Sequence, residues 1–251
     1  MAVRSAPRLD EASRAWPEFA TSLLESGFNT AGVLRAHDYD AIVPAAWQSQ
    51  SLLPGARSAL VLACGGRSFG EAFARSREAR DGRADPVDRF TERTVSGAIL
   101  RRREPHLAAN ALYYWEQQDG HFADFVALAR ACGLGSPSRL GVLIHPHYGP
   151  WVAIRAVILT QAPLSVTPSL QTPSPCQDCP APCAAACPGA ALARLDFDVS
   201  ACVRTTLSRE TCRLRCDARR ACVIGREHAY GASTERLFRS AVVRILSGAR
   251  R

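Results

Sequence analysis

The sequence CQDCPAPCAAACP at residues 176–188 places Cys176, Cys179, Cys183 and Cys187 in one short run that ends in Pro188. Four further cysteines follow this run: Cys202, Cys212, Cys216 and Cys222. The two groups together hold eight of the ten cysteines in the chain. Because a [4Fe–4S] cluster is held by four cysteine thiolates, residues 176–222 predict two such clusters.

The spacing of the first run predicts which cysteines share a cluster. It has the form C-x2-C-x3-C-x3-C-P, which is similar to the bacterial ferredoxin run with one additional residue within Pro180-Ala181-Pro182. In two-cluster ferredoxins the fourth cysteine of each run binds the other cluster. The same crossing here predicts one cluster on Cys176, Cys179, Cys183 and Cys222, and a second on Cys187, Cys202, Cys212 and Cys216.

Three other interpretations of these cysteines remain open. Disulfide bonds are the first, although the chain does not open on a signal peptide and disulfides are rare in reducing compartments. Structural zinc is the second, although zinc sites usually pair two cysteines, a long gap and two more cysteines. Inert buried thiols are the third. The close spacing and the Cys187-Pro188 ending favour iron–sulfur clusters over all three.

The composition is that of an ordinary globular protein, except in its basic residues. Apolar residues make up 47% and charged residues 22%, and no apolar run approaches the ~18 residues of a membrane helix. All 31 basic residues are arginine, and the formal net charge is +8. This balance suits an acidic partner, nucleic acid or a solvated arginine-rich surface. Basic and aromatic residues do not interleave as in an RNA-binding sheet, so we expect neither nucleic acid nor a membrane as partner.

The rest of the sequence predicts an α+β fold. Helical spacing predicts helices at residues 10–26, 69–79, 87–103, 106–118, 121–132 and 232–247. Apolar runs predict strands at 59–63, 140–144 and 152–159, and residues 30–44 are expected to be mixed and partly extended. Prolines among serine and threonine at 161–175 predict a linker. We therefore expect a domain with one sheet at residues 1–165 and a cluster-binding module at residues 166–251.

One residue interrupts the apolar run at 151–159. Arg155 lies among valine, isoleucine, alanine and leucine. Arginine is almost never buried without a partner, and its planar guanidinium matches a carboxylate, a phosphate or an amide. Arg155 is therefore expected either in an internal ion pair or in contact with a ligand.

Four stretches of the first domain resemble the CblC-type cobalamin-processing proteins. They are 53–55 (LPG), 85–88 (DPVD), 111–119 (ALYYWEQQD) and 145–155 (HPHYGPWVAIR), and they occur in the family's order. The resemblance covers roughly residues 25–160. It implies a fold like that of the flavin nitroreductases, and binding of cobalamin with its lower base detached, followed by removal of the upper ligand.

The cysteine-rich region is similar to the two-cluster half of epoxyqueuosine reductase, another cobalamin enzyme of the same fold. The resemblance therefore implies a nitroreductase-like α/β domain with a C-terminal dicluster ferredoxin-like module. The tRNA-contacting helical repeat of that enzyme has no counterpart between Cys222 and Arg251, so we do not expect a tRNA substrate.

The two resemblances also assign residues. Trp151, Ile154 and Arg155 fall where CblC-type proteins line the upper face of the corrin, and Tyr114 and Glu116 fall at the matching end of a helix. Glu116 stands where the family has an amide side chain. Asp88 corresponds to a proton-donating aspartate of the epoxyqueuosine enzyme, or it is a surface carboxylate.

The sequence thus leads us to expect a soluble, cytoplasmic oxidoreductase. Two [4Fe–4S] clusters would pass electrons to a bound corrinoid, and the upper ligand, such as cyanide, would be removed reductively. The electron donor would be a separate reductase or ferredoxin. Two alternatives are a cobalamin-dependent reductase of another substrate, and a plain electron-transfer ferredoxin.

Overall fold

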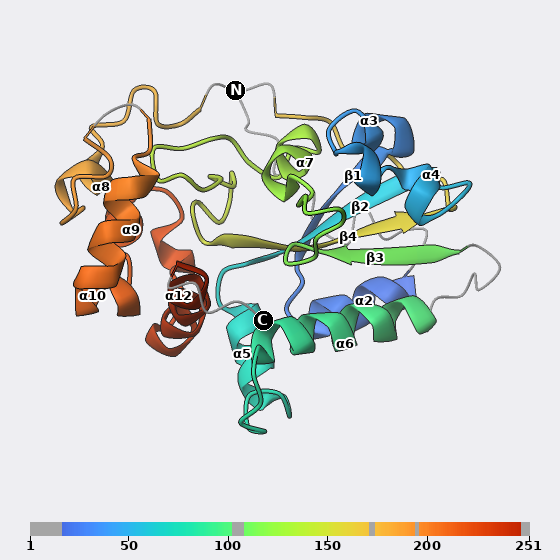
Figure 1. Cartoon of the computed structure of the whole chain (residues 1–251), viewed down its shortest axis with the longest axis horizontal. Coiled ribbons are helices and arrows are strands. Elements are labelled where there is room, and N and C mark those ends of the chain that lie inside the picture. The colour runs from blue at the N-terminus through green and yellow to red at the C-terminus, as the bar shows by residue number, and fades with distance from the viewer. Residues whose placement is uncertain (1–16, 102–107, 171–173, 194–195, 247–251) are drawn as a thin grey trace. The chain divides into compact units, whose positions relative to one another are not determined.

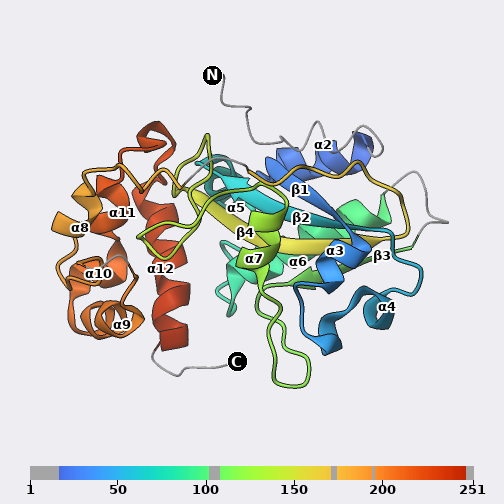
Figure 2. The same ribbon diagram turned by 90° about the horizontal axis from the view of Figure 1, so that it is seen from above.

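The computed structural model describes residues 17–101, 108–170, 174–193 and 196–246. Contacts within the chain define two compact units (Figures 1 and 2). We call Met1–Gly135 with Val152–Gln171 the sheet unit, and Ser136–Trp151 with Thr172–Arg251 the cysteine unit. The chain therefore leaves the sheet unit after Gly135 and returns to it at Val152.

The sheet unit is built on one antiparallel sheet of four strands in the order β1-β2-β4-β3 (Figure 1). These strands are β1 (Thr30–Arg35), β2 (Ser58–Gly65), β3 (Ala109–Tyr113) and β4 (Val152–Thr160). Every residue of β2 is buried. A central strand that is covered on both faces has no need of polar alternation, which is why its sequence is a continuous apolar run.

Helices cover both faces of this sheet. Figure 1 shows α2 (Pro17–Glu25) and α6 (Pro86–Leu100) on one face and α7 (Phe125–Ala131) on the other. Phe69 of α5 (Ser68–Arg75) packs edge-on against Phe28 and Phe90, with ring centroids 5.3 and 5.4 Å apart. Three short helices follow β1: α3 (Ala36–Asp40), η2 (Ala45–Trp47) and α4 (Ser49–Leu52). The packing of Phe69 against Phe28 and Phe90 joins α5 to α6 and to the turn before β1.

The outer edge of β1 is covered by the segment that follows β4. The backbone N–H of Val33 donates to the Thr167 hydroxyl at 2.8 Å, and the N–H of Thr167 donates to the carbonyl of Val33 at 3.1 Å. The N–H of Leu164 donates to Ser58 Oγ at 2.9 Å. Residues 163–167, which the sequence placed in a linker, therefore satisfy backbone groups of an edge strand.

The cysteine unit consists of short helices and loops. Its helices are α8 (Pro182–Ala185), α9 (Val199–Ser208), α10 (Glu210–Leu214), α11 (Asp217–Ala221), η3 (Arg226–His228) and α12 (Ala232–Leu246). Glu235 of α12 is buried, pairs with Arg220 at 2.8 Å from Nε, and accepts the backbone N–H of Cys216 at 3.0 Å. The Arg239 Nε–H donates to the carbonyl of Cys212 at 2.8 Å. The apolar core of this unit is small. These charged contacts therefore have a large part in fixing the backbone around the cysteines.

The segment Ser136–Trp151 is joined to the rest of the cysteine unit at several points. The Arg219 Nε–H donates to the carbonyl of Pro150 at 2.9 Å, and the Ser174 hydroxyl donates to the carbonyl of Pro137 at 2.7 Å. Gly149 has φ +58°, and a Cβ there would lie 2.2 Å from the carbonyl oxygen of Ile224. The segment is therefore an integral part of this unit.

The structure confirms the α+β fold class and most of the predicted elements. The strands at 59–63 and 152–159 correspond to β2 and β4, and the helices at 69–79, 87–103 and 232–247 correspond to α5, α6 and α12. Residues 30–44 are mixed as expected, and the helix at 121–132 begins only at Phe125. The predicted residues 10–16, 102–107 and 247 lie outside the described part of the chain. No helix in that part is long and apolar enough to cross a membrane.

Two predictions were wrong. Residues 106–118 were expected to be helical, but 109–113 form β3, which pairs with β4 from Ala109↔Thr160 to Tyr113↔Ala156. Residues 140–144 were expected to form a strand, but only the isolated bridge Ser136↔Ile144 is present there. For residues 109–113, pairing with the distant β4 decided the outcome, and local periodicity does not report such pairing.

Candidate cofactor sites

The cysteines of the first run come together with the last cysteine of the region. Burial raises the pKa of the Cys183 thiol, and the neighbouring thiols of Cys222, Cys176 and Cys179 raise it further. Burial likewise raises the pKa of Cys222, and Cys176 and Cys179 add to the effect. Thiols that interact in this way lie close together. They are the four cysteines that the crossed spacing predicted for one cluster.

The remaining four cysteines interact in pairs. Burial raises the pKa of Cys212, and Cys187 is among the groups that raise it further, while Arg239 lowers it. Burial raises the pKa of Cys216, Cys202 adds to this, and the nearby Arg239 and Arg219 lower it. These interactions link Cys212 with Cys187 and Cys216 with Cys202, so they give two pairs of thiols.

The backbone before Cys183 accommodates the additional residue of the first run. Ala181 adopts a left-handed conformation, φ 54°, and Pro182 then begins α8. Left-handed φ is uncommon for a residue with a Cβ, so the turn is one of the few strained positions of the unit. It brings Cys183 into a buried position in spite of the longer spacing.

The arrangement of donors differs from that of a single-ion site. All ten cysteines are free thiols. Among the described residues, no three histidine, cysteine or acidic side chains are grouped closely enough to hold one ion. Around zinc the sulfurs would all lie ~2.3 Å from a common centre, whereas in a [4Fe–4S] cluster each thiolate binds a different iron and the sulfurs lie farther apart.

Arg155 occupies an irregular position in β4 of the sheet unit. The register of β2 and β4 runs Leu62↔Ala156 and then Ala63↔Ile154, so Arg155 has no partner opposite it. Such a β-bulge redirects a side chain. Arg155 is only 5% exposed, and its guanidinium carbon lies 4.9 Å from the ring centroid of Phe69 and 5.9 Å from that of Tyr114.

Cys64 lies at the Arg155 guanidinium, and Asp88 is joined to these side chains through Tyr114. Burial raises the pKa of the Cys64 thiol, and the charge and hydrogen bond of Arg155 lower it. The Tyr114 hydroxyl donates to Asp88 Oδ1 at 3.0 Å. Asp88 is half-buried in the first turn of α6, which begins at Pro86 after a left-handed Asp85. Side chains from β2, α5, α6, the turn after β3 and β4 thus form one group, which we call the Arg155 group: Cys64, Phe69, Asp88, Tyr114 and Arg155.

The other predicted contact residues lie elsewhere. Glu116 accepts the backbone N–H of Tyr113 at 2.7 Å, and burial raises its pKa. It lines a cavity of about 330 Å³ with Trp47, Asn110 and other residues. Ile154 is half-buried on β4. Trp151 belongs to the cysteine unit, where it is 1% exposed and packs against Tyr230 with ring centroids 5.3 Å apart.

Sequence reasoning missed the residues that support these groups. Phe69 was expected only as part of a helix, and Cys64 only as a core thiol. The cysteine backbone is held by Glu235 and Arg239, which looked like ordinary members of an amphipathic helix. Only the break in the apolar run at Arg155 drew attention to its surroundings.

The fold of this chain is similar to that of several solved oxidoreductases. No protein-family model and no curated protein matches the chain. Epoxyqueuosine reductase, solved with an epoxyqueuosine-modified tRNA-Tyr stem loop, matches with a TM-score of 0.52 and 15% identity over 88% of this chain and 68% of its own. The catabolic reductive dehalogenase NpRdhA, solved with 3-bromo-4-hydroxybenzoic acid, matches with a TM-score of 0.53 and 16% identity over 92% and 34%.

A second reductive dehalogenase structure, described as suggesting a mechanism for B12-dependent dehalogenation, matches with a TM-score of 0.51 and 16% identity over 92% of this chain and 36% of its own. The chain thus spans about two thirds of the reductase and about a third of each dehalogenase. Matches this long include residues of both the sheet unit and the cysteine unit. At these identities they show that this chain has the fold of these oxidoreductases.

Proposed function

We propose that the protein is an iron–sulfur oxidoreductase that acts on a bound corrinoid. The observation that carries the proposal is that Cys176, Cys179, Cys183 and Cys222, the four thiols that the crossed spacing predicts for one cluster, lie close together. The fold shared with a B12-dependent class of reductase supports it.

In this proposal the cysteine unit holds two [4Fe–4S] clusters, which supply single electrons when bound. Its cysteines are the ligands. Arg239 and Glu235 fix the backbone of Cys212 and Cys216, and hydrogen bonding and charge around the thiolates tune a cluster's potential. A separate reductase or ferredoxin would be the donor, and a reducing cytoplasm would keep the thiolates available.

The sheet unit is the nitroreductase-like part and, by the CblC resemblance, the part that holds the corrinoid. Tyr114, Glu116, Ile154 and Arg155, together with Trp151, are the proposed contacts. Arg155 is preorganised for such a role, because the bulge and the Phe69 ring fix its guanidinium. The proposed reaction is reductive removal of the upper ligand, for example cyanide, with the corrinoid as substrate.

A second candidate is reduction of another substrate with the corrinoid as cofactor. The hydrogen bond from Tyr114 to Asp88 favours this candidate, because it places a carboxyl group within the Arg155 group. A carboxyl held there by a phenol could deliver a proton to a substrate carbon, which removal of cyanide does not require.

Anaerobic purification followed by addition of hydroxocobalamin tests the proposal. We expect about eight iron atoms per chain and a change in the corrinoid absorbance spectrum on binding. Zinc in place of iron, or about four irons after reconstitution, would contradict the two-cluster assignment. Full iron content with no spectral change would leave a plain electron-transfer ferredoxin.

Asp88→Asn separates the two candidates. If the upper ligand is simply removed, the variant reduces cyanocobalamin at the wild-type rate. If turnover is abolished while corrinoid binding and iron content are unchanged, proton delivery is central and the second candidate holds. Asp81→Asn is a matched control, because it makes the same substitution at a nearby aspartate that pairs with Arg89 at an exposed position.

A further inference from the structure

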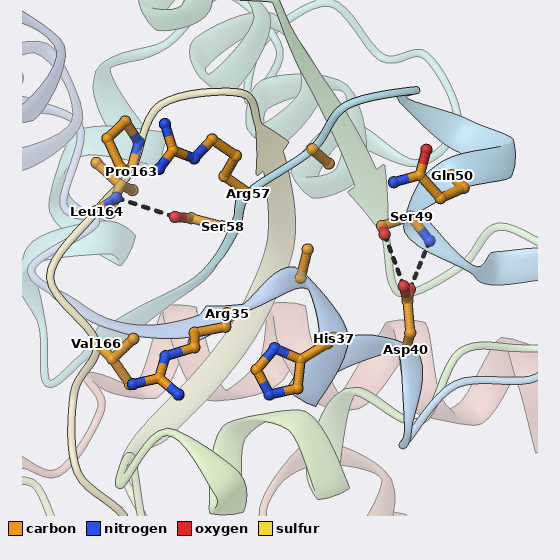
Figure 3. A pocket seen from close by; sticks show the side chains of 12 residues that line it. Arg35, His37, Asp40, Ser49, Gln50, Arg57, Ser58, Pro163, Leu164 and Val166 are labelled. Atoms are coloured by element: carbon orange, nitrogen blue, oxygen red, sulfur yellow. Dashed lines mark hydrogen bonds between the residues drawn. The ribbon is translucent and has the colours of Figure 1, made fainter.

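A cavity of about 500 Å³ opens in the sheet unit beside the end of β1 (Figure 3). Its lining comes from the β1–α3 junction, from α4, from the start of β2 and from residues 163–166. None of the lining residues belongs to the Arg155 group, and nothing in the proposed function uses this cavity.

The polar part of the lining includes two arginines and a histidine. Figure 3 shows Arg35 and His37 on one side and Arg57 on the other. Both arginines are exposed, and among the described residues neither guanidinium donates a hydrogen bond or joins an ion pair. Cations held without a partner in a concave site attract an anion.

The carboxylate of the described lining is already engaged. Asp40 Oδ1 accepts the backbone N–H of Ser49 at 2.6 Å, and Oδ2 accepts the Ser49 hydroxyl at 2.8 Å. Asp40 thus organises the start of α4 and does not pair with Arg35 or Arg57. The two guanidinium groups are left to face the cavity with their donors available.

The remaining wall is apolar and fixed in place. It is formed by Ala56, Pro163, Leu164 and Val166. The hydrogen bond from Leu164 to Ser58 and the two bonds between Thr167 and Val33 hold this wall against the sheet. An apolar wall next to a group of cationic donors matches a ligand that has an anionic end and a flat organic part.

We propose that this cavity binds a phosphate-bearing organic ligand of about nucleotide size. The planar forks of Arg35 and Arg57 suit the oxygens of a phosphate, whereas His37 Nε2 is already engaged by Asp38 Oδ1 at 2.8 Å. The volume lies within the ~300–1,000 Å³ of small-molecule sites. The proposal is independent of the corrinoid assignment.

Isothermal titration of the full chain with ADP and with inorganic pyrophosphate, at constant ionic strength, tests the proposal. We expect both to bind, and Arg35→Gln and Arg57→Gln each to weaken both by on the order of tenfold. Arg75→Gln is the matched control, because Arg75 is an exposed arginine of the same unit outside the cavity, and it should leave both affinities unchanged.

Val166→Ser tests the organic part of the ligand. Val166 is 42% exposed, so the substitution should leave the fold intact. The substitution should weaken the binding of ADP several-fold and leave the affinity for pyrophosphate unchanged. No binding of either probe at millimolar concentration, or equal loss in the Arg75→Gln control, would overturn the anion site. An ADP affinity in Val166→Ser equal to that of the wild type would overturn the assignment of a nucleotide-sized ligand.

Discussion

Arg155 is held by ring faces and a thiol at a bulge of the sheet. Contacts between a guanidinium and an aromatic ring contribute roughly 0.5–2 kcal/mol each, so the side chain stabilises the sheet unit only modestly. A buried arginine that stabilises the fold so little is consistent with a role in binding. The break in the apolar run was visible in the sequence, but the bulge, Cys64 and Phe69 were not, because strand register and ring packing are non-local.

Arg155→Gln should weaken corrinoid binding or slow reduction by on the order of tenfold or more, equivalent to ~1.4 kcal/mol. Arg155→Lys should not restore it, because an ammonium lacks the planar two-point contact. Absorbance titration with cobalamin and a thermal melt are the measurements. Arg93→Gln is the control, since Arg93 also lies over a ring, 5.5 Å from the centroid of Phe90. A collapsed melt would make Arg155 a structural charge.

The crossed spacing predicts that Cys187 and Cys222, each the fourth cysteine of its run, bind different clusters. Cys187→Ala and Cys222→Ala should each remove one cluster and about half of the iron, and the double variant should remove nearly all of it. Iron analysis and electron paramagnetic resonance of the reduced protein are the measurements. Cys132→Ala, at a buried thiol outside both sets, should keep the full iron content. A double variant that retained half of the iron would place both cysteines on one cluster.

At the scale of elements, the sequence predicted what is locally determined. β2 and β4 are recognisable because strands covered on both faces are continuously apolar. β3 resembled a helix because it is a short edge strand with two aromatic residues after it, and only its pairing with β4 makes it extended. The proximity of Cys222 to the first run was predictable, because cysteine spacing along the chain constrains which thiols can converge.

The loop between Ile144 and Gly149 depends on a neutral imidazole. His145 Nδ1 accepts the backbone N–H groups of His147 and Tyr148 at 3.1 and 3.2 Å, so it must be unprotonated. Burial, together with His147 and His228, lowers the pKa of His145 to about 4. In the unfolded chain the pKa is ~6.5. Between these values the unfolded state binds more protons, so the free energy of unfolding decreases as the pH falls from about 6.5 to 4.

This effect amounts to at most about 3 kcal/mol, and we expect it as a falling melting temperature over that range. His145→Asn keeps an acceptor at the Nδ1 position without a titrating group, and should make the melting temperature less dependent on pH. Iron content at each pH shows whether cluster loss contributes. An identical pH dependence in the variant would show that His145 is not the titrating group.

At the scale of the whole molecule, the cysteine unit is discontinuous in sequence. The stretch Ser136–Trp151 contributes the carbonyl of Pro150 to Arg219 and that of Pro137 to Ser174. A fragment of residues 172–251 should therefore fail to hold iron, whereas residues 136–251 should retain much of it. Iron content and circular dichroism of the two fragments compare them. Equal iron in both would show that the first stretch is dispensable.

The segment that covers β1 has a practical consequence for work on the sheet unit. Protein ending at residue 165, the boundary expected from the sequence, would lack Thr167 and expose the N–H and carbonyl of Val33 at the rim of the sheet. Exposed strand rims pair with other copies, so this version should precipitate on concentration. Protein ending after Leu170 keeps the cover and should stay dispersed. Residues 166–170 thus decide whether the purified sheet unit remains in solution or aggregates.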